Sequence, residues 1–80
     1  MQKLNDLKIN DEAIIQSVKA KQNIKKRFLD IGLVKGTKIK VLLISPLKDM
    51  TAYLIKGAVI AIRKEDTKDI IVKVIKWKLV

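Results

Sequence analysis

The amino-acid sequence predicts a mainly β domain: a small, partly open barrel of five to six short antiparallel strands, with one short helix between the first and second strands. Three observations lead to this fold class. Short segments rich in β-branched residues follow one another closely, with turn residues between them. Only one segment has apolar residues at helical spacing. Strands this short and closely spaced must also curl together to hide their edges, which favours a barrel.

The first elements are a lead-in over residues 4–9 and a strand over residues 13–19. Leu4 and Leu7 in the lead-in are spaced to cover one end of a core. Residues 10–12 are Asn, Asp and Glu, which have turn chemistry. The strand that follows is rich in β-branched residues, as strands are.

A short helix is predicted over residues 22–31. Ile24, Phe28 and Ile31 recur at i, i+4 and i+7, and therefore form one apolar stripe that faces the core. Gly32 follows directly and suits a left-handed C-terminal cap. The helix is therefore expected to end at Ile31.

The second predicted strand, over residues 38–45, follows a turn that contains Gly36. Ile39, Val41 and Leu43 alternate with neighbours such as Lys38 and Lys40, which predicts a half-buried strand with these three residues on its inner face. The remaining elements are a loop at 46–49, strands at 51–55 and 58–63 joined by a tight Lys-Gly turn, a helical turn at 65–69, and a last strand at 70–75.

The composition excludes several classes of enzyme and metal site. The chain has no cysteine and no histidine, so Ser-His-Asp and Cys-His catalysis, zinc sites and imidazole-ligated iron are ruled out. Its three glycines are too scattered for a phosphate-binding loop. Glu65, Asp66 and Asp69 cluster in the sequence. Acidic side chains near the start of a helix are stabilised by the helix dipole, and we interpret these residues as helix-end residues rather than as metal ligands. We expect no catalysis, no cofactor and no metal site.

The net charge of +10 invites a nucleic-acid interpretation. Sixteen of the eighteen cations are lysines, however, and the codons of lysine and of the frequent isoleucine are AT-rich, so genome composition explains part of this charge. Phe28, Tyr53 and Trp77 are the only aromatics, whereas single-strand binders present several stacking platforms. No nucleic acid is therefore expected as a partner, and a basic barrel that binds nucleic acid remains the alternative.

A basic run lies around the start of the helix, at Lys19, Lys21, Lys25, Lys26 and Arg27. It has three interpretations: a solvated face, a surface for an acidic protein domain, or a surface for the anionic inner leaflet of a membrane. The longest apolar run is five residues, 58–62, against the roughly twenty that a membrane span needs. Without an apolar signal-peptide stretch at residues 1–6, we expect one cytoplasmic domain over residues 1–80.

The segment from Arg27 to Thr37, RFLDIGLVKGT, resembles the R-L-x-x-L-G-L-x-x-G signature of the FeoA family. Features before and after it agree in order and spacing, so that the resemblance covers roughly residues 4–75. It implies a small SH3-like barrel of the bacterial ferrous iron transport system. Two departures occur, at residues 11–12 and 48–50, where the family often has Gly-Glu and Gly-Asp-Pro; they concern turn conformations rather than the fold.

The resemblance implies a cytoplasmic accessory protein that contacts FeoB, a membrane transporter with a cytosolic GTP-binding domain, at the inner face of the membrane. Whether it activates, assembles or gates the transporter stays open, as does self-association through exposed strand edges. No role is assigned to the tail over residues 76–80. The family motif places the partner-binding residues at Arg27, Leu29, Asp30, Gly32, Leu33 and Gly36.

Each of these residues also has a structural interpretation. Gly32 and Gly36 suit a helix cap and a turn. Arg27 and Asp30 lie three residues apart on one helix face, and we expect them to pair with each other. Leu33 lies just beyond the cap, in what we expect to be an exposed loop, where its side chain is able to anchor a partner. On that interpretation, Leu33→Asp leaves the fold intact and weakens binding.

Overall fold

The computed structural model describes residues 2–75. The elements in chain order are β1 (Gln2–Lys3), the 3₁₀ helix η1 (Leu4–Asp6), β2 (Glu12–Val18), α1 (Gln22–Ile31), β3 (Lys38–Ile44), β4 (Met50–Ile55), β5 (Ala58–Arg63), α2 (Lys64–Thr67) and β6 (Ile70–Ile75). The tail at residues 76–80, which includes Trp77, lies outside the described residues. None of the helices within residues 2–75 has the length and hydropathy required to cross a membrane.

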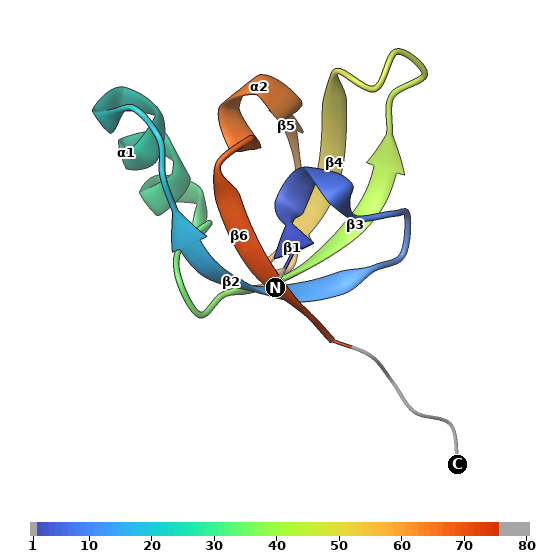
Figure 1. The fold of residues 1–80 in the computed structure, drawn as a ribbon, viewed down its shortest axis with the longest axis horizontal. Helices are drawn as coiled ribbons and strands as arrows, with labels where there is room; N and C mark the ends of the chain where they lie inside the picture. The colour runs from blue at the N-terminus through green and yellow to red at the C-terminus, as the bar shows by residue number, and fades with distance from the viewer. Residues whose placement is uncertain (1, 76–80) are drawn as a thin grey trace.

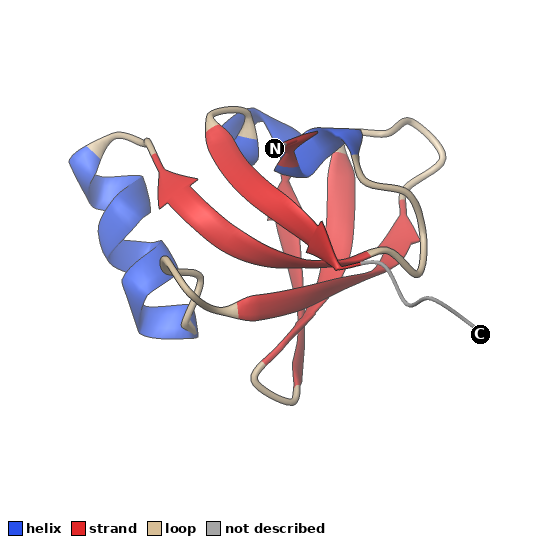
Figure 2. Cartoon of the chain, turned by 60° about the horizontal axis from the view of Figure 1, so that its bottom comes forward, coloured by secondary structure: helices blue, strands red, loops and turns tan. Residues whose placement is uncertain are grey.

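The six strands form one antiparallel sheet in the order β1-β6-β2-β3-β4-β5. The sheet curls around the core, and α1 lies at one end of it, beside the last residues of β2 (Figures 1 and 2). This confirms the predicted fold class, a mainly β, SH3-like barrel that is partly open. The helix occupies the predicted place between the first two long strands, β2 and β3.

Side-chain hydrogen bonds from Asn5 join the two ends of the strand order. Its Nδ2 donates to the carbonyl of Lys64 at 2.9 Å, and Thr67 Oγ1 donates to its Oδ1 at 2.6 Å. Asn5 lies in η1, next to the edge strand β1, whereas Lys64 and Thr67 lie in α2, directly after the other edge strand, β5. Thr67 is fully buried and Asn5 is half-buried, so these bonds are partly shielded from water. They link the two edges, between which no strand pairing is found among the described residues.

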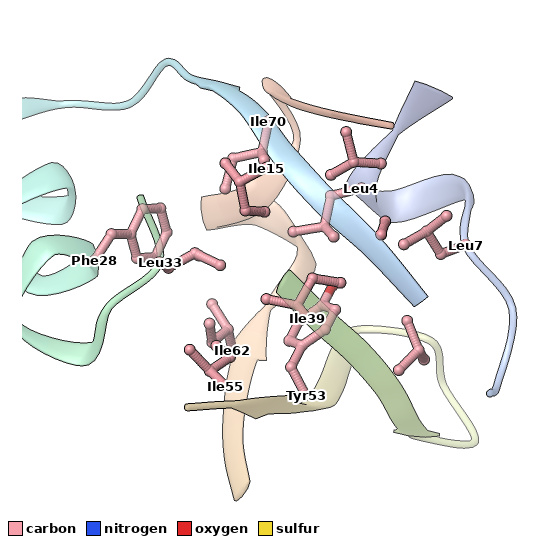
Figure 3. Packing of buried hydrophobic residues seen from close by; sticks show 13 residues of the cluster. Leu4, Leu7, Ile15, Phe28, Leu33, Ile39, Tyr53, Ile55, Ile62 and Ile70 are labelled. Atoms are coloured by element: carbon pink, nitrogen blue, oxygen red, sulfur yellow. The ribbon is translucent and has the colours of Figure 1, made fainter. Parts of the chain in front are cut away.

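The core fills the space inside the curled sheet (Figure 3). Its side chains come from every long strand, from η1 and from α1; they are Leu4, Leu7, Ala13, Ile15, Phe28, Leu33, Ile39, Val41, Tyr53, Ile55, Ile62, Ile70 and Val72. Burial raises the pKa of Tyr53, and the neighbouring hydroxyls of Thr51 and Thr67 offset only part of that rise. The phenol is therefore neutral in the core at physiological pH.

Most of the predicted elements are confirmed, several to the residue. The helix Gln22–Ile31 and the strands Ala58–Arg63 and Ile70–Ile75 have the predicted bounds, and the others differ by one to three residues at an end. Phe28 is buried, with Ile24 and Ile31 packed partly against the core, as the stripe predicts. Lys56 and Gly57 both have positive φ, 49° and 81°, as expected of a tight hairpin turn.

Two features of the sheet differ from the sequence prediction. The first is β1, whose two residues are too few to show any periodicity; it pairs with Val72 and Ile71 of β6. The second is the orientation of Leu43, which is 62% exposed rather than inward. Val41 opposes Tyr53 and Leu43 opposes Ala52, so β3 has one extra residue there, a β-bulge. The extra residue shifts the alternation by one, and Leu43 is turned outward.

The bulge leads to a paired prediction on one strand. We expect Val41→Asp to abolish cooperative folding, because it places an unpaired charge at a position that is 1% exposed, a cost of about 4 kcal/mol or more. Leu43→Asp, two residues along, is expected to melt within a few degrees of the unmodified protein. Circular dichroism melts of both variants measure this. Equal destabilisation by the two substitutions would contradict the bulge.

Candidate partner-binding site

The candidate site is built around the end of α1, where the chain turns sharply at Gly32. This residue has φ 86° and ψ 12°, the left-handed conformation. The Gly32 amide donates to the Leu29 carbonyl at 3.2 Å, and the Leu33 amide donates to the Phe28 carbonyl at 2.8 Å. This pair of hydrogen bonds is the Schellman motif, which satisfies the last carbonyls of the helix. The positive φ is what favours glycine here, because a Cβ would otherwise meet only the flexible side chain of Lys56, 2.9 Å away at its Cδ.

Leu33 is completely buried, so the expectation that it lies exposed in a loop is wrong. The Schellman turn explains why: it commonly brings the residue after the glycine into contact with the last turn of the helix. Figure 3 shows Leu33 directed into the barrel beside Phe28. The side chain of Leu33 therefore anchors α1 to the core, and Leu33→Asp is expected to disrupt the fold.

The exposed apolar residue of the motif is Leu29, whose side chain is 65% exposed. Successive residues of a helix are rotated by about 100°, so a helix that buries Phe28 turns Leu29 toward its flank. Leu29 thus has the solvent exposure that the sequence predicts for Leu33. It presents apolar surface to solvent directly beside the anchored end of α1.

Leu29 borders a groove between α1 and β2, which we call the α1 groove. Its volume is about 570 Å³, within the range of ligand-binding pockets. Its apolar lining comes from the end of β2, from α1 and from the loop after the helix: Val18, Leu29, Leu33 and Val34. Gln16, Ser17 and Gln22 add polar groups. Three lysines complete the lining: Lys25, Lys26 and Lys35.

The loop after the helix is held in place by backbone hydrogen bonds to β2. The Gly36 amide donates to the Ile15 carbonyl at 2.8 Å, and the Ile15 amide donates to the Thr37 carbonyl at 2.9 Å. A β-bulge follows in β2, since Ile15 opposes Val72 while Ser17 opposes Ile71. The bulge turns Val18 toward the core side, where it packs against buried residues and lines the α1 groove. The groove therefore has walls fixed by the fold.

The structure divides the basic run of the sequence among three places. Lys25 and Lys26 border the α1 groove. Lys19 and Lys21 lie at a different hollow, together with Glu65, Asp66 and Asp69. Arg27 borders a third hollow. The run is thus not one uniform basic surface: Lys19 and Lys21 lie in the loop before α1, and the other three residues lie on α1 but border two different hollows.

The charged pair of the motif is also arranged differently from expectation. Arg27 and Asp30 are both exposed, and within residues 2–75 they form no ion pair with each other. Arg27 instead borders a small hollow with Arg63 and Asp66. The predicted pairing is therefore wrong, and both charges are presented to solvent.

The lining of the α1 groove suits the binding of another molecule. Ser17 is its one hydroxyl, and the chain has no histidine or cysteine to activate it. Among the described residues, no group of three or more Asp or Glu side chains is arranged to hold a metal ion. Apolar walls with a polar and cationic border are what a protein or ligand surface can dock into.

Comparison with known proteins identifies the family. A family model for the FeoA domain matches residues 2–74. The chain belongs to the FeoA domain family. This confirms the resemblance that the motif from Arg27 to Thr37 carries, and FeoA is a family involved in ferrous iron transport.

The structure of this FeoA domain is close to those of solved relatives. The solution structure of FeoA from Chlorobium tepidum is 35% identical, with a TM-score of 0.88 over 94% of this chain and 71% of that one. The zinc complex of FeoA from Stenotrophomonas maltophilia, described as a procaryotic SH3 domain protein, has a TM-score of 0.76 at 22% identity, over 91% of each chain. At that identity the likeness shows the fold alone.

A curated relative combines this domain with a transporter. It is the Fe(2+) transport protein A/Fe(2+) transporter FeoB fusion protein of Porphyromonas gingivalis, 34% identical over 73 residues. The match covers 91% of this FeoA domain but 9% of the relative. The alignment thus concerns one small part of a much longer protein.

Sequence reasoning missed Val18, Val34 and Lys35 as residues of the candidate site. Val18 lies within the predicted strand over residues 13–19, and Lys35 lies beside Gly36 in the predicted turn, so neither position indicates a binding role. The pair Gly32-Leu33 does indicate burial. A glycine followed by an apolar residue at the end of a helix is typical of a Schellman turn, in which the apolar residue packs against the helix. The bulge that orients Val18 leaves no such signal in the sequence.

The two leucines on either side of Gly32 are expected to differ sharply in their effect on stability. Leu33→Ala is expected to lower the free energy of unfolding by about 2–4 kcal/mol, because it leaves a cavity in the core. Leu29→Ala is expected to change it by less than about 0.5 kcal/mol, because the side chain is mostly exposed. Urea titrations monitored by circular dichroism measure both. A larger loss for Leu29→Ala than for Leu33→Ala would reverse our assignment.

Proposed function

We propose that this chain is a non-catalytic accessory protein of ferrous iron uptake that acts on a FeoB-type transporter by direct contact, at the cytoplasmic face of the membrane. The observation that carries the proposal is the relative in which this domain and FeoB are named as one fusion protein. A covalent fusion holds two partners at a high effective concentration, and that arrangement suits partners that otherwise meet by weak contact.

The contact region that we propose extends from Arg27 to Gly36. Within it, the residues divide by burial into those that touch the partner and those that position them. Leu29, Arg27 and Asp30 are exposed and are assigned to the contact. Gly32 and Leu33 shape the turn and anchor it, while Gly36 lies in the loop that is bonded to β2. The partner therefore meets α1 and its following loop as a preformed surface.

The inventory of chemical groups supports a binding role. The α1 groove offers exposed apolar surface and cations, and among the described residues no carboxylate or imidazole lines it beside Ser17. With a net charge of +10, the chain attracts an acidic partner surface at long range, and salt weakens that attraction. We propose that this charge speeds the encounter, whereas the apolar contact holds the complex.

Binding to the transporter tests the proposal directly. We expect saturable one-to-one binding in the micromolar range when this protein is titrated by calorimetry into the transporter's cytosolic GTP-binding domain, with an affinity that falls as salt is raised. The same titration with the full-length transporter in nanodiscs covers a contact that needs its membrane part. If neither form binds, the accessory role is refuted.

A further inference from the structure

We propose that the α1 groove receives a short segment of the transporter in which an apolar side chain is flanked by aspartate or glutamate. This inference rests on the proposed function and adds to it the place of contact and the chemistry of the partner. It is carried by two observations that concern the same ten lining residues: their apolar walls and their charge.

The α1 groove has apolar walls that the fold holds in place. Leu29 on α1 and Val34 on the loop line the groove together with Val18 at the end of β2, and the buried Leu33 lies against it. Leu29 is 65% exposed, so covering it removes apolar surface from water, at about 25 cal/mol for each Å². The walls are held by the Schellman turn and by the bonds of Ile15, and little ordering is therefore required when a partner enters.

The border of the α1 groove is positively charged. Lys25 and Lys26 on α1 and Lys35 on the loop line the groove, and no acidic side chain does so among the described residues. A purely apolar ligand makes no use of the three exposed ammonium groups, whereas flanking carboxylates pair with them. Cations around an apolar pocket thus select a ligand of the opposite charge and reject a basic one.

The concave shape favours a protein segment over a membrane or a nucleic acid. A short protein segment can place an apolar side chain and its neighbours in a groove of about 570 Å³, whereas a flat lipid surface does not follow its shape. Nucleic-acid bases stack on aromatic side chains, and none lines this groove among the described residues. Lipid and nucleic acid are therefore the competing outcomes of the test.

A second copy of this chain is a poor occupant. Two copies each carrying a net charge of +10 repel one another. Leu29 is followed by Asp30, but Leu29 already forms part of the groove lining. The other exposed large apolar side chains have no acidic residue directly beside them in the sequence. These side chains are Ile9, Leu43, Leu47, Leu54 and Val59.

The first test compares two aspartate substitutions of similar exposure. Leu29→Asp alters the groove wall, and Val59→Asp alters β5, where the side chain is 67% exposed and outside the groove. Binding of each to the full-length transporter is measured by biolayer interferometry, in nanodiscs of neutral phosphatidylcholine. We expect Leu29→Asp to weaken binding about tenfold or more, and Val59→Asp to stay within about twofold. Circular dichroism melts check that both variants fold.

The second test isolates the lysines of the groove from the total charge. Lys25→Glu, Lys26→Glu and Lys35→Glu are combined in one variant. Its matched control combines Lys3→Glu, Lys8→Glu and Lys73→Glu, which are exposed elsewhere and give the same net charge. We expect the groove variant to lose about tenfold or more in affinity, and the control about threefold or less, through slower association.

The outcomes separate this inference from the proposed function. If the unmodified protein binds the transporter and the groove variants bind as tightly, the groove is not the contact, and the accessory role stands. If the unmodified protein does not bind, the accessory role and this inference fall together.

Two further measurements test whether the α1 groove binds lipid or nucleic acid instead of the transporter. Co-sedimentation with vesicles that contain phosphatidylglycerol, or filter binding of random oligonucleotides, would overturn the inference if Leu29→Asp abolished either while leaving transporter binding intact. Peptides that tile the cytosolic segments of the transporter test the chemistry itself. We expect the tightest to carry an apolar residue beside Asp or Glu, and tightest peptides without acids would contradict the charge argument.

Discussion

The left-handed turn at Gly32 is the constraint on which the candidate site depends. Were α1 to continue through Leu33, that residue would lie roughly 140° around the helix from Phe28 and point away from the core. The turn instead folds Leu33 back onto the helix end, where its amide caps the Phe28 carbonyl and its side chain is fully buried. One backbone conformation thus ends the helix, fastens it to the barrel and leaves Leu29 outside.

The partly open barrel gives this turn its setting. Pairing of β2 with β3 extends from Glu12 to Ile14, whereas pairing of β2 with β6 continues to Val18. Beyond Ile15, β2 stays paired with β6 but has left β3. The helix α1 and the loop after it lie beside this end of β2 (Figure 2). A helix covers such an opening less tightly than a strand would, since its side chains meet the sheet at intervals. The α1 groove is what remains between them.

Periodicity and turn chemistry were enough to predict the fold class, because five of the strands and the helix each bury one face. The same reasoning failed for Leu43, since a β-bulge shifts the alternation and is set by the pairing of β3 with β4. It failed for Leu33 because a loop position was taken to mean exposure. The site itself, Val18 with Leu29 and Val34, joins segments far apart in the sequence, and no local pattern reveals that contact.

Charge in this protein acts at two ranges, which its composition alone does not distinguish. The net charge of +10 is a property of the whole chain and is screened beyond about 8–10 Å at physiological salt. The lysines that matter for selection are those beside apolar surface, where water is displaced on binding and screening is weakest. Lys19 and Lys21 line a hollow together with acidic residues, whereas no acidic side chain among the described residues lines the α1 groove with Lys25, Lys26 and Lys35. The many lysines of this chain therefore contribute to partner selection only where the fold places them around the α1 groove.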